Sequence, residues 1–200
     1  MSDSSGRVVA SSIDDAIPDE ALRLLWAFER AKRAASVAEI AGLIRDYQLP
    51  REAVPTQWLD ERDVWAALLD SEMPMTAMIR NLATMTRVGL LTPGSEAARR
   101  ITAELANRKR LLAARVHPIA LLSALATYQS GHGVRGSNTW EPVAQVVDAL
   151  DAAFYLAFGA VTPANRRMLL ALDVSGSMGM GMIAGVPGLT PRLGSAAMAL

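Results

Sequence analysis

Cysteine is absent from this sequence of 200 residues, which excludes a disulfide framework and any thiolate metal site. No apolar run reaches the length of about 20 residues that a membrane-spanning helix needs. The first residues, Met1–Arg7, contain no apolar stretch of the secretory-signal type. Lysine and arginine together equal aspartate and glutamate in number, so the whole chain has no basic excess. We therefore expect a soluble, cytoplasmic protein.

Recognisable catalytic motifs are missing as well. The chain has two histidines, His117 and His132, and no H-E-x-x-H, nucleophile-elbow or P-loop pattern. His117 precedes a proline at an expected helix start, where a capping or structural role is the better interpretation. Aspartyl-phosphate chemistry at Asp173 would need a second acid and a phosphate-binding lysine nearby, and the adjacent sequence offers neither. We do not expect an enzyme.

Apolar residues recur at helical spacing through most of the chain, which favours a mainly α fold. Residues 1–17 are polar and acidic, and we predict a disordered lead-in there. Tryptophans and methionines within the helical patterns are expected to pack in the core. Successive helices with short loops indicate a bundle or a helical-repeat solenoid. We predict helices over residues 18–28, 37–44, 58–69, 74–85, 95–114, 118–129 and 142–159.

Charge is unevenly distributed along the chain. Residues 80–135 carry nine basic and only two acidic side chains, and arginine's planar fork matches phosphate oxygens. A solvated basic helix face is the alternative, but such faces usually interleave acids. We favour a nucleic-acid surface. Its candidate residues are Arg80, Arg87, Arg99, Arg100, Arg108, Lys109, Arg110, Arg115 and Arg135, together with His132.

A glycine-rich segment, Gly131–Gly136, satisfies the pattern G-x-G-x-x-G. A dinucleotide fingerprint must follow a strand and open a helix, whereas this segment follows a helical run and leads into a loop. We reject cofactor binding there. The glycines either let the backbone approach a partner, with His132 and Arg135 as donors to phosphate, or allow a sharp turn between helices.

The motif Asp173-Val-Ser175-Gly-Ser177 directly follows the apolar run 168–172. Such a run has the length of a buried strand, and a carboxylate with two hydroxyls at its end supplies oxygen ligands suited to Mg²⁺. An ordinary strand-to-loop turn has a similar composition. We keep Asp173, Ser175 and Ser177 as a candidate metal site, which could also engage a partner protein's carboxylate.

Several separate motifs in this sequence resemble those of the Ro autoantigen family, whose members carry a TROVE domain. The resemblance covers about residues 20–200. Its motifs are Met73–Leu82, Arg115–Pro118, Tyr128–Gly136, Trp140-Glu-Pro, Leu150–Tyr155 and Leu169–Met178. In that family a ring of HEAT-like helical repeats binds RNA, and a von Willebrand factor A domain with the D-x-S-x-S site closes the ring.

The resemblance implies a TROVE-like helical-repeat region over 18–163 and a truncated von Willebrand A-like segment over 166–200. That segment would hold the first strand and part of the first helix of an α/β domain, with Thr190 as the helix N-cap. Because the later ligands of related A domains would lie beyond Leu200, we expect poor Mg²⁺ affinity. The implied function is binding of small noncoding and structured or defective RNA in a ribonucleoprotein, as RNA quality control and without DNA specificity. The alternative is a metal-dependent protein-binding module.

Overall fold

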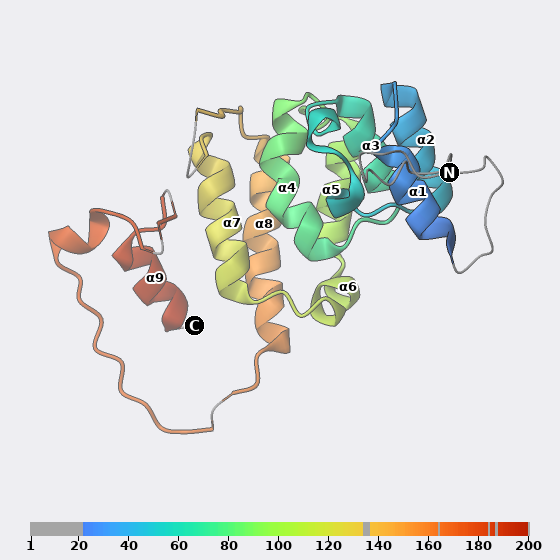
Figure 1. Cartoon of the computed structure of the whole chain (residues 1–200). Coiled ribbons are helices and arrows are strands. Elements are labelled where there is room, and N and C mark those ends of the chain that lie inside the picture. The colour runs from blue at the N-terminus through green and yellow to red at the C-terminus, as the bar shows by residue number, and fades with distance from the viewer. Residues whose placement is uncertain (1–21, 134–136, 164, 184, 187, 200) are drawn as a thin grey trace, which may run out of the picture.

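A computed structural model describes residues 22–133, 137–163, 165–183, 185–186 and 188–199. The lead-in predicted over 1–17 lies outside these residues. The described chain is a bundle of helices, α1 to α8, followed by a long excursion that ends in α9 (Figure 1). The elements are α1 (Arg23–Ala31), α2 (Val37–Tyr47), η2 (Arg51–Ala53), η3 (Thr56–Trp58), α3 (Arg62–Asp70), α4 (Met75–Arg87), α5 (Glu96–Ala106), α6 (Arg108–Ala113), α7 (Pro118–Ser130), α8 (Ala144–Ala157), η4 (Phe158–Ala160), η5 (Gly176–Gly179) and α9 (Pro191–Met198).

Short polar side chains set the starts of several helices. The Ser36 hydroxyl accepts a hydrogen bond from the Glu39 amide at the start of α2, and Ser95 accepts one from Ala98 at the start of α5. The His117 imidazole accepts from the Ile119 amide before α7. These bonds satisfy backbone donors that have no partner within the helix. The capping role predicted for His117 is thereby confirmed.

One helix predicted as continuous, over residues 95–114, is broken at Asn107. The backbone of Asn107 leaves the helical region at φ −76° and ψ 90°, and its side chain accepts from the Arg110 amide to begin α6. Asparagine stabilises such a start better than a helix interior because its side chain competes for backbone donors. The helix predicted from residue 58 likewise begins later, at Arg62.

The core runs through the whole bundle. Trp65 is only 1% exposed, and its indole nitrogen donates to the Leu59 carbonyl. Met73, Met75, Met78 and Met85 are buried as the helical spacing predicted. Closely packed pairs are α2 with α3, α5 with α8 and α7 with α8. None of the helices among the described residues is both long and apolar enough to cross a bilayer.

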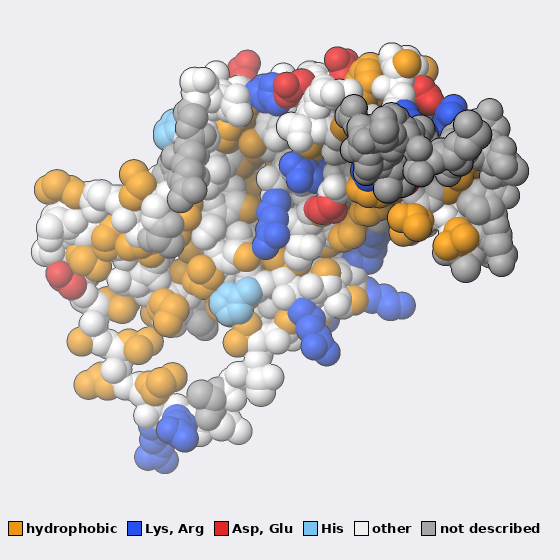
Figure 2. Space-filling view, viewed as in Figure 1, with side chains coloured by type: hydrophobic (Ala, Val, Ile, Leu, Met, Phe, Trp, Pro, Cys, Tyr) orange, Lys and Arg blue, Asp and Glu red, His pale blue; other side chains and the backbone are white. Residues whose placement is uncertain are grey.

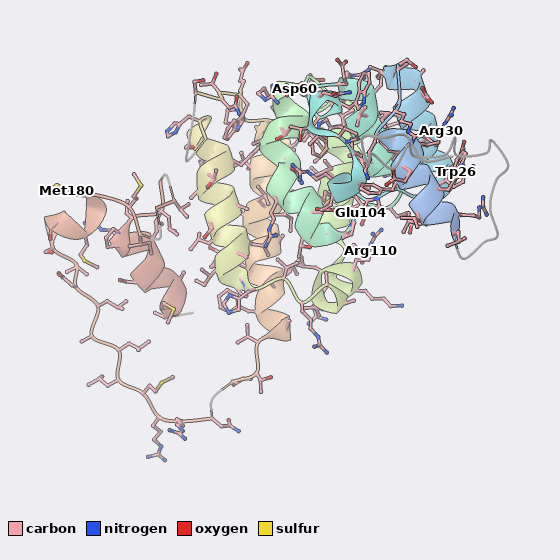
Figure 3. All side chains as sticks on the ribbon, viewed as in Figure 1. Trp26, Arg30, Asp60, Glu104, Arg110 and Met180 are labelled. Atoms are coloured by element: carbon pink, nitrogen blue, oxygen red, sulfur yellow. The ribbon has the colours of Figure 1, made fainter. Side chains whose placement is uncertain are left out.

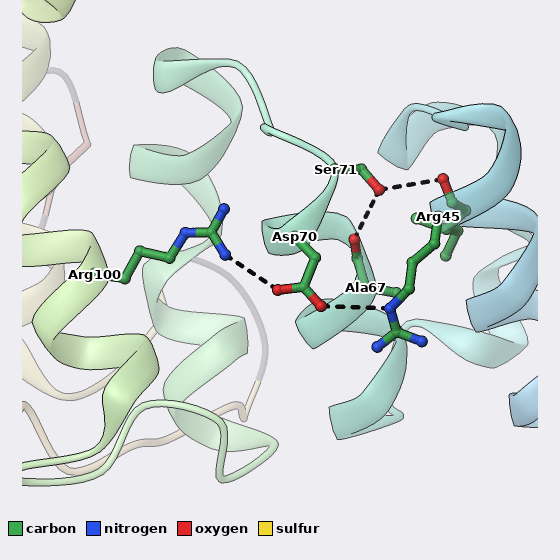
Figure 4. Close-up of polar contacts among 6 residues, drawn as sticks. Arg45, Ala67, Asp70, Ser71 and Arg100 are labelled. Carbon is green, nitrogen blue, oxygen red and sulfur yellow. Dashed lines mark hydrogen bonds and ion pairs between the residues drawn. The ribbon is translucent and has the colours of Figure 1, made fainter.

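Asp70 links helices that are distant in sequence. Its carboxylate accepts from Arg45 of α2 at 3.4 Å and from Arg100 of α5 at 3.1 Å (Figure 4). The adjacent Ser71 hydroxyl lies 3.2 Å from the Ile44 carbonyl and 3.0 Å from the Ala67 carbonyl and shares its one proton between them. Each ion pair is half exposed and worth at most about 1 kcal/mol. Together they add weak links from α2 and α5 to the C-terminal end of α3.

Tyr128 connects α4, α7 and the loop that precedes α8. Its side chain is 2% exposed, and its hydroxyl lies 2.8 Å from the Thr86 hydroxyl and accepts from the Val143 amide. The Trp140 ring stacks on the Tyr128 ring, and the Trp140 indole donates to the Tyr128 carbonyl. A buried hydroxyl with two partners is costly to remove.

The strand predicted over residues 168–172 is wrong for this structure. The described residues between Val161 and Ser175 have no helix or strand, and Leu169 is 97% exposed. A strand needs a neighbour for its backbone hydrogen bonds, and among the described residues only one isolated bridge occurs, between His132 and Thr139. The predicted short helix after Thr190 is present as α9, with Thr190 as its N-cap.

We expect Tyr128→Phe to lower the free energy of unfolding by about 1–3 kcal/mol, because Thr86 and the Val143 amide lose a buried partner. Urea denaturation followed by circular dichroism measures this. Tyr155→Phe is the matched control, since Tyr155 is 57% exposed and its hydroxyl has no partner among the described residues. Equal stability of the two variants would contradict a role for Tyr128 as a structural link.

Candidate nucleic-acid interface

Four of the ten residues predicted to contact phosphate are held by other parts of the protein. Arg87 pairs with Asp60, and Arg100 pairs with Asp70. Arg110 pairs with Glu104 at 2.9 Å where α5 meets α6 (Figure 3). Arg99 donates to the Gly94 carbonyl at 2.6 Å. A guanidinium engaged in this way loses a partner when it turns toward an external phosphate.

Four other basic residues are exposed and have no ion-pair or hydrogen-bond partner for their side chains among the described residues. We call them the basic quartet: Arg80, Arg108, Lys109 and Arg115. Arg80 lies on α4, Arg108 and Lys109 begin α6, and Arg115 lies in the turn between α6 and α7. Figure 2 shows Lys and Arg side chains over the middle and the lower part of the bundle. Arg135 lies outside the described residues.

Two members of the quartet line hollows, Arg80 one and Arg115 the other. The first, which we call the α4–α7 groove, has a volume of about 350 Å³ and is lined by Arg80 and Val116. The second, which we call the α6–α7 hollow, has about 280 Å³ and is lined by Arg115, His117 and the same Val116. The Arg108 guanidinium lies beside Gly159 of η4, where a Cβ would be 3.1 Å from its Nη2 atom, and the next residue, Ala160, lines this hollow. The shared Val116 makes the two hollows neighbours.

His132 is not brought to the quartet. It lies beyond the C-terminal end of α7, whereas Arg115 lies just before the N-terminal end of the same helix, about 20 Å away along 13 residues. Gly131 takes a left-handed conformation, with φ 72°, and a Cβ there would approach the Trp140 carbonyl to 3.0 Å. This supports the turn interpretation of the glycine-rich segment at Gly131.

Sequence reasoning missed the polar lining of the α4–α7 groove. Thr76, Ser123 and Thr127 line it, and their hydroxyls have no hydrogen-bond partner among the described residues. The sequence does contain an indication of this lining, because Ser123 and Thr127 are four residues apart and therefore share a helix face. The basic block was identified by charge alone, which says nothing about grooves.

The candidate metal loop brings its three oxygen-bearing side chains together. The Asp173 carboxylate accepts from the Ser175 amide at 2.8 Å, and the Ser175 and Ser177 hydroxyls lie 2.9 Å apart. Hydrogen bonds from the backbone and side chain of Ser175 lower the pKa of the fully exposed Asp173. No cluster of three or more acidic or histidine ligands occurs within the described residues.

These residues fit a divalent cation only in part. One carboxylate and two hydroxyls are oxygen ligands of the type that Mg²⁺ accepts, with waters completing an octahedron. The Arg192 guanidinium, however, donates to the Ser175 carbonyl at 3.3 Å and places positive charge beside the loop.

The chain is similar to several known proteins. Residues 46–127 match the TROVE domain. A Deinococcus radiodurans protein named RNA-binding protein RO60 is 45% identical over 197 residues, covering 96% of this chain and 37% of that protein. A Caenorhabditis elegans protein of the same name is 46% identical over 158 residues, covering 79% of this chain and 24% of that protein.

A solved structure shares the fold. The crystal structure of the Deinococcus radiodurans RO (RSR) protein matches with a TM-score of 0.83 at 45% identity, covering 93% of this chain and 38% of that one. This chain therefore spans well under half the length of the relatives it matches.

For the metal loop, we expect Mg²⁺ to bind this chain only weakly, in the millimolar range, because a single carboxylate supplies the charge. Isothermal titration calorimetry measures the affinity, and Asp173→Asn is the control that removes the one carboxylate. Micromolar binding that Asp173→Asn abolishes would show that the loop is a complete site as it stands.

Proposed function

The chain belongs to the Ro family of TROVE-domain proteins, and from this membership we propose that it binds RNA through the basic quartet. The observation that carries the proposal is that some basic residues of segment 80–135 have internal partners and others have none. Arg80, Arg108, Lys109 and Arg115 have no partner among the described residues. Their charges are available to phosphates without loss of an internal contact.

The physics of phosphate contact supports this choice of residues. Each phosphate neutralised by a lysine or arginine releases condensed counterions, which drives binding and makes it depend on salt. Arginine also holds a phosphate through two parallel hydrogen bonds. Three arginines and one lysine, on α4, on α6 and in the turn before α7, therefore form a surface that can contact the RNA backbone. Such contacts position RNA without reading its sequence.

The class of RNA that we propose is the one that the resemblance to the Ro family implies, and the physics of base exposure favours RNAs with single-stranded parts. The deep, narrow major groove of duplex RNA cannot be read by side chains, whereas loops and ends expose their bases. We propose small noncoding RNAs and structured or defective RNAs with single-stranded ends as ligands, within a ribonucleoprotein that serves RNA quality control. Both similar proteins named above are called RNA-binding proteins. The proposed role is binding, without catalysis.

A second candidate function is metal-dependent binding of a protein partner at Asp173, Ser175 and Ser177. It is favoured by the convergence of their oxygens in an exposed loop. A partner's carboxylate would complete the coordination of a bound Mg²⁺, and the cation would supply the attraction between the two negative groups. Chelator abolishes binding under this alternative and leaves the RNA surface unaffected.

The test of RNA binding is a salt titration with a stem-loop RNA that has a single-stranded 3′ tail. We expect the variant Arg80→Ala/Arg108→Ala/Lys109→Ala/Arg115→Ala to bind more weakly, and the slope of log K against log salt to fall by roughly 3, since four contacts contribute about 0.7–0.9 each. Fluorescence anisotropy on the full chain measures both quantities.

The matched control is Arg87→Ala/Arg99→Ala/Arg100→Ala/Arg110→Ala, which removes the same charge from residues with internal partners. We expect it to change the salt slope less, with circular dichroism verifying its fold. Equal loss in both variants would contradict the assignment to the quartet. Binding that salt does not weaken would overturn the proposal.

A further inference from the structure

The α4–α7 groove is formed by two helix faces of similar design. On each helix the lining residues are three or four positions apart, so they form one stripe along the helix. The stripe on α4 comprises Thr76, Ile79, Arg80 and Ala83, and the stripe on α7 comprises Ala120, Ser123, Ala124 and Thr127. Most of these side chains are small. A hollow of about 350 Å³ therefore remains between the two helices.

The groove combines an apolar floor with polar groups that lack partners. Thr76, Ser123 and Thr127 each offer a hydroxyl that can donate or accept. Arg80 supplies a guanidinium that is also without a partner among the described residues. A groove with several convergent, unused polar groups is the usual form of a small-ligand site.

The two ends of the groove differ. The hydrogen bond between Thr86 and Tyr128 joins α4 to α7 just past Ala83 and Thr127. In the other direction the lining includes Val116, which also lines the α6–α7 hollow beside Arg115. A ligand lying in the groove can thus continue as a chain past Val116 toward a second cation.

The larger hollow of the protein has the opposite character. It lies between α7, α8 and α9, has a volume of about 500 Å³, and is lined mainly by apolar side chains such as Leu122, Leu125 and Phe154. Its one charged lining residue is Asp151. An anionic ligand is disfavoured there by the carboxylate, so charge distinguishes the two hollows.

We propose that the α4–α7 groove holds one unpaired nucleotide of the bound RNA, with its phosphate at Arg80 and its base against Ala83 and Ala124. The proposal rests on the RNA-binding function proposed above and gives it a defined subsite. The hydroxyls of Thr76, Ser123 and Thr127 serve the base edge or the ribose, and because each can donate or accept they tolerate different bases. The following phosphate passes toward Arg115. A paired base cannot enter, since its edge is engaged within the duplex.

The probe is adenosine monophosphate, compared with inorganic phosphate and followed by NMR chemical-shift changes on the full chain. We expect saturable binding of the nucleotide and at least about tenfold weaker binding of phosphate alone, because the base adds contact energy. Ala124→Leu fills the groove and should weaken nucleotide binding about tenfold or more. Ala120→Leu, at an exposed position of the same stripe, is the second variant in case Ala124→Leu does not fold.

The matched control is Ala152→Leu, an exposed alanine on α8 outside the groove lining, which should bind like the unchanged chain. Inorganic phosphate binding as tightly as the nucleotide would overturn the proposal, as would unchanged nucleotide binding in a folded Ala124→Leu or Ala120→Leu variant.

The stem-loop titration distinguishes failure of the groove proposal from failure of the proposed RNA-binding function. If the chain binds the stem-loop with the expected salt dependence but does not bind the nucleotide, the groove proposal falls and RNA binding stands. If the quartet variant binds the stem-loop as well as the unchanged chain, the proposed function falls independently of the groove.

Discussion

The buried hydroxyl of Tyr128 is the contact on which the arrangement of the second half of the bundle depends. It lies between Thr86 of α4 and the Val143 amide before α8, so one atom fixes three segments. Trp140 covers the same ring and closes the loop after α7. Because α4 is tied to α7 at this end, the faces of the two helices farther along can stay apart and leave the groove open.

The positions of the acidic side chains decide which basic residues form ion pairs within the protein and which face solvent. Residues 80–135 contain only Glu96 and Glu104 as acids, so most partners for their arginines must come from elsewhere. Asp60 and Asp70, at the ends of the η3 and α3 region, reach Arg87 and Arg100. At α6, Glu104 reaches Arg110, but no acid among the described residues pairs with Arg108 or Lys109, and these two side chains are exposed. The surface that we assign to RNA is thus what remains after the fold has used the other cations internally.

Helix starts could be predicted from the sequence because they depend on local contacts. The caps at His117 and Thr190 involve a side chain and an amide two or three residues away. The break at Asn107 was missed because the apolar spacing continues through it, and a single side-chain preference decided the outcome. The strand over 168–172 failed for the opposite reason, since strand formation needs partners that no local pattern supplies.

The site could be predicted only in outline. Local charge density selects the basic block as a candidate, but which of its arginines have no internal partner depends partly on Asp60 and Asp70, which lie tens of residues away from Arg87 and Arg100. The oxygens of Asp173, Ser175 and Ser177 do converge as their alternate spacing suggested. The groove between α4 and α7 could not be predicted from composition, because many of its residues are alanines, threonines and a serine, which are common in helices.

The exposed excursion before α9 has a consequence for how this helix is held. Residues 165–175 have no helix or strand, and such a length of extended chain spans about 35 Å. A segment on a tether of this kind meets its docking face at a high effective concentration, on the order of millimolar. The contacts of Leu189 and Ala197 with the bundle can therefore be individually weak and still be occupied most of the time. Cutting the tether would remove this effective concentration, and lengthening it would lower it gradually, without altering any residue at the contact.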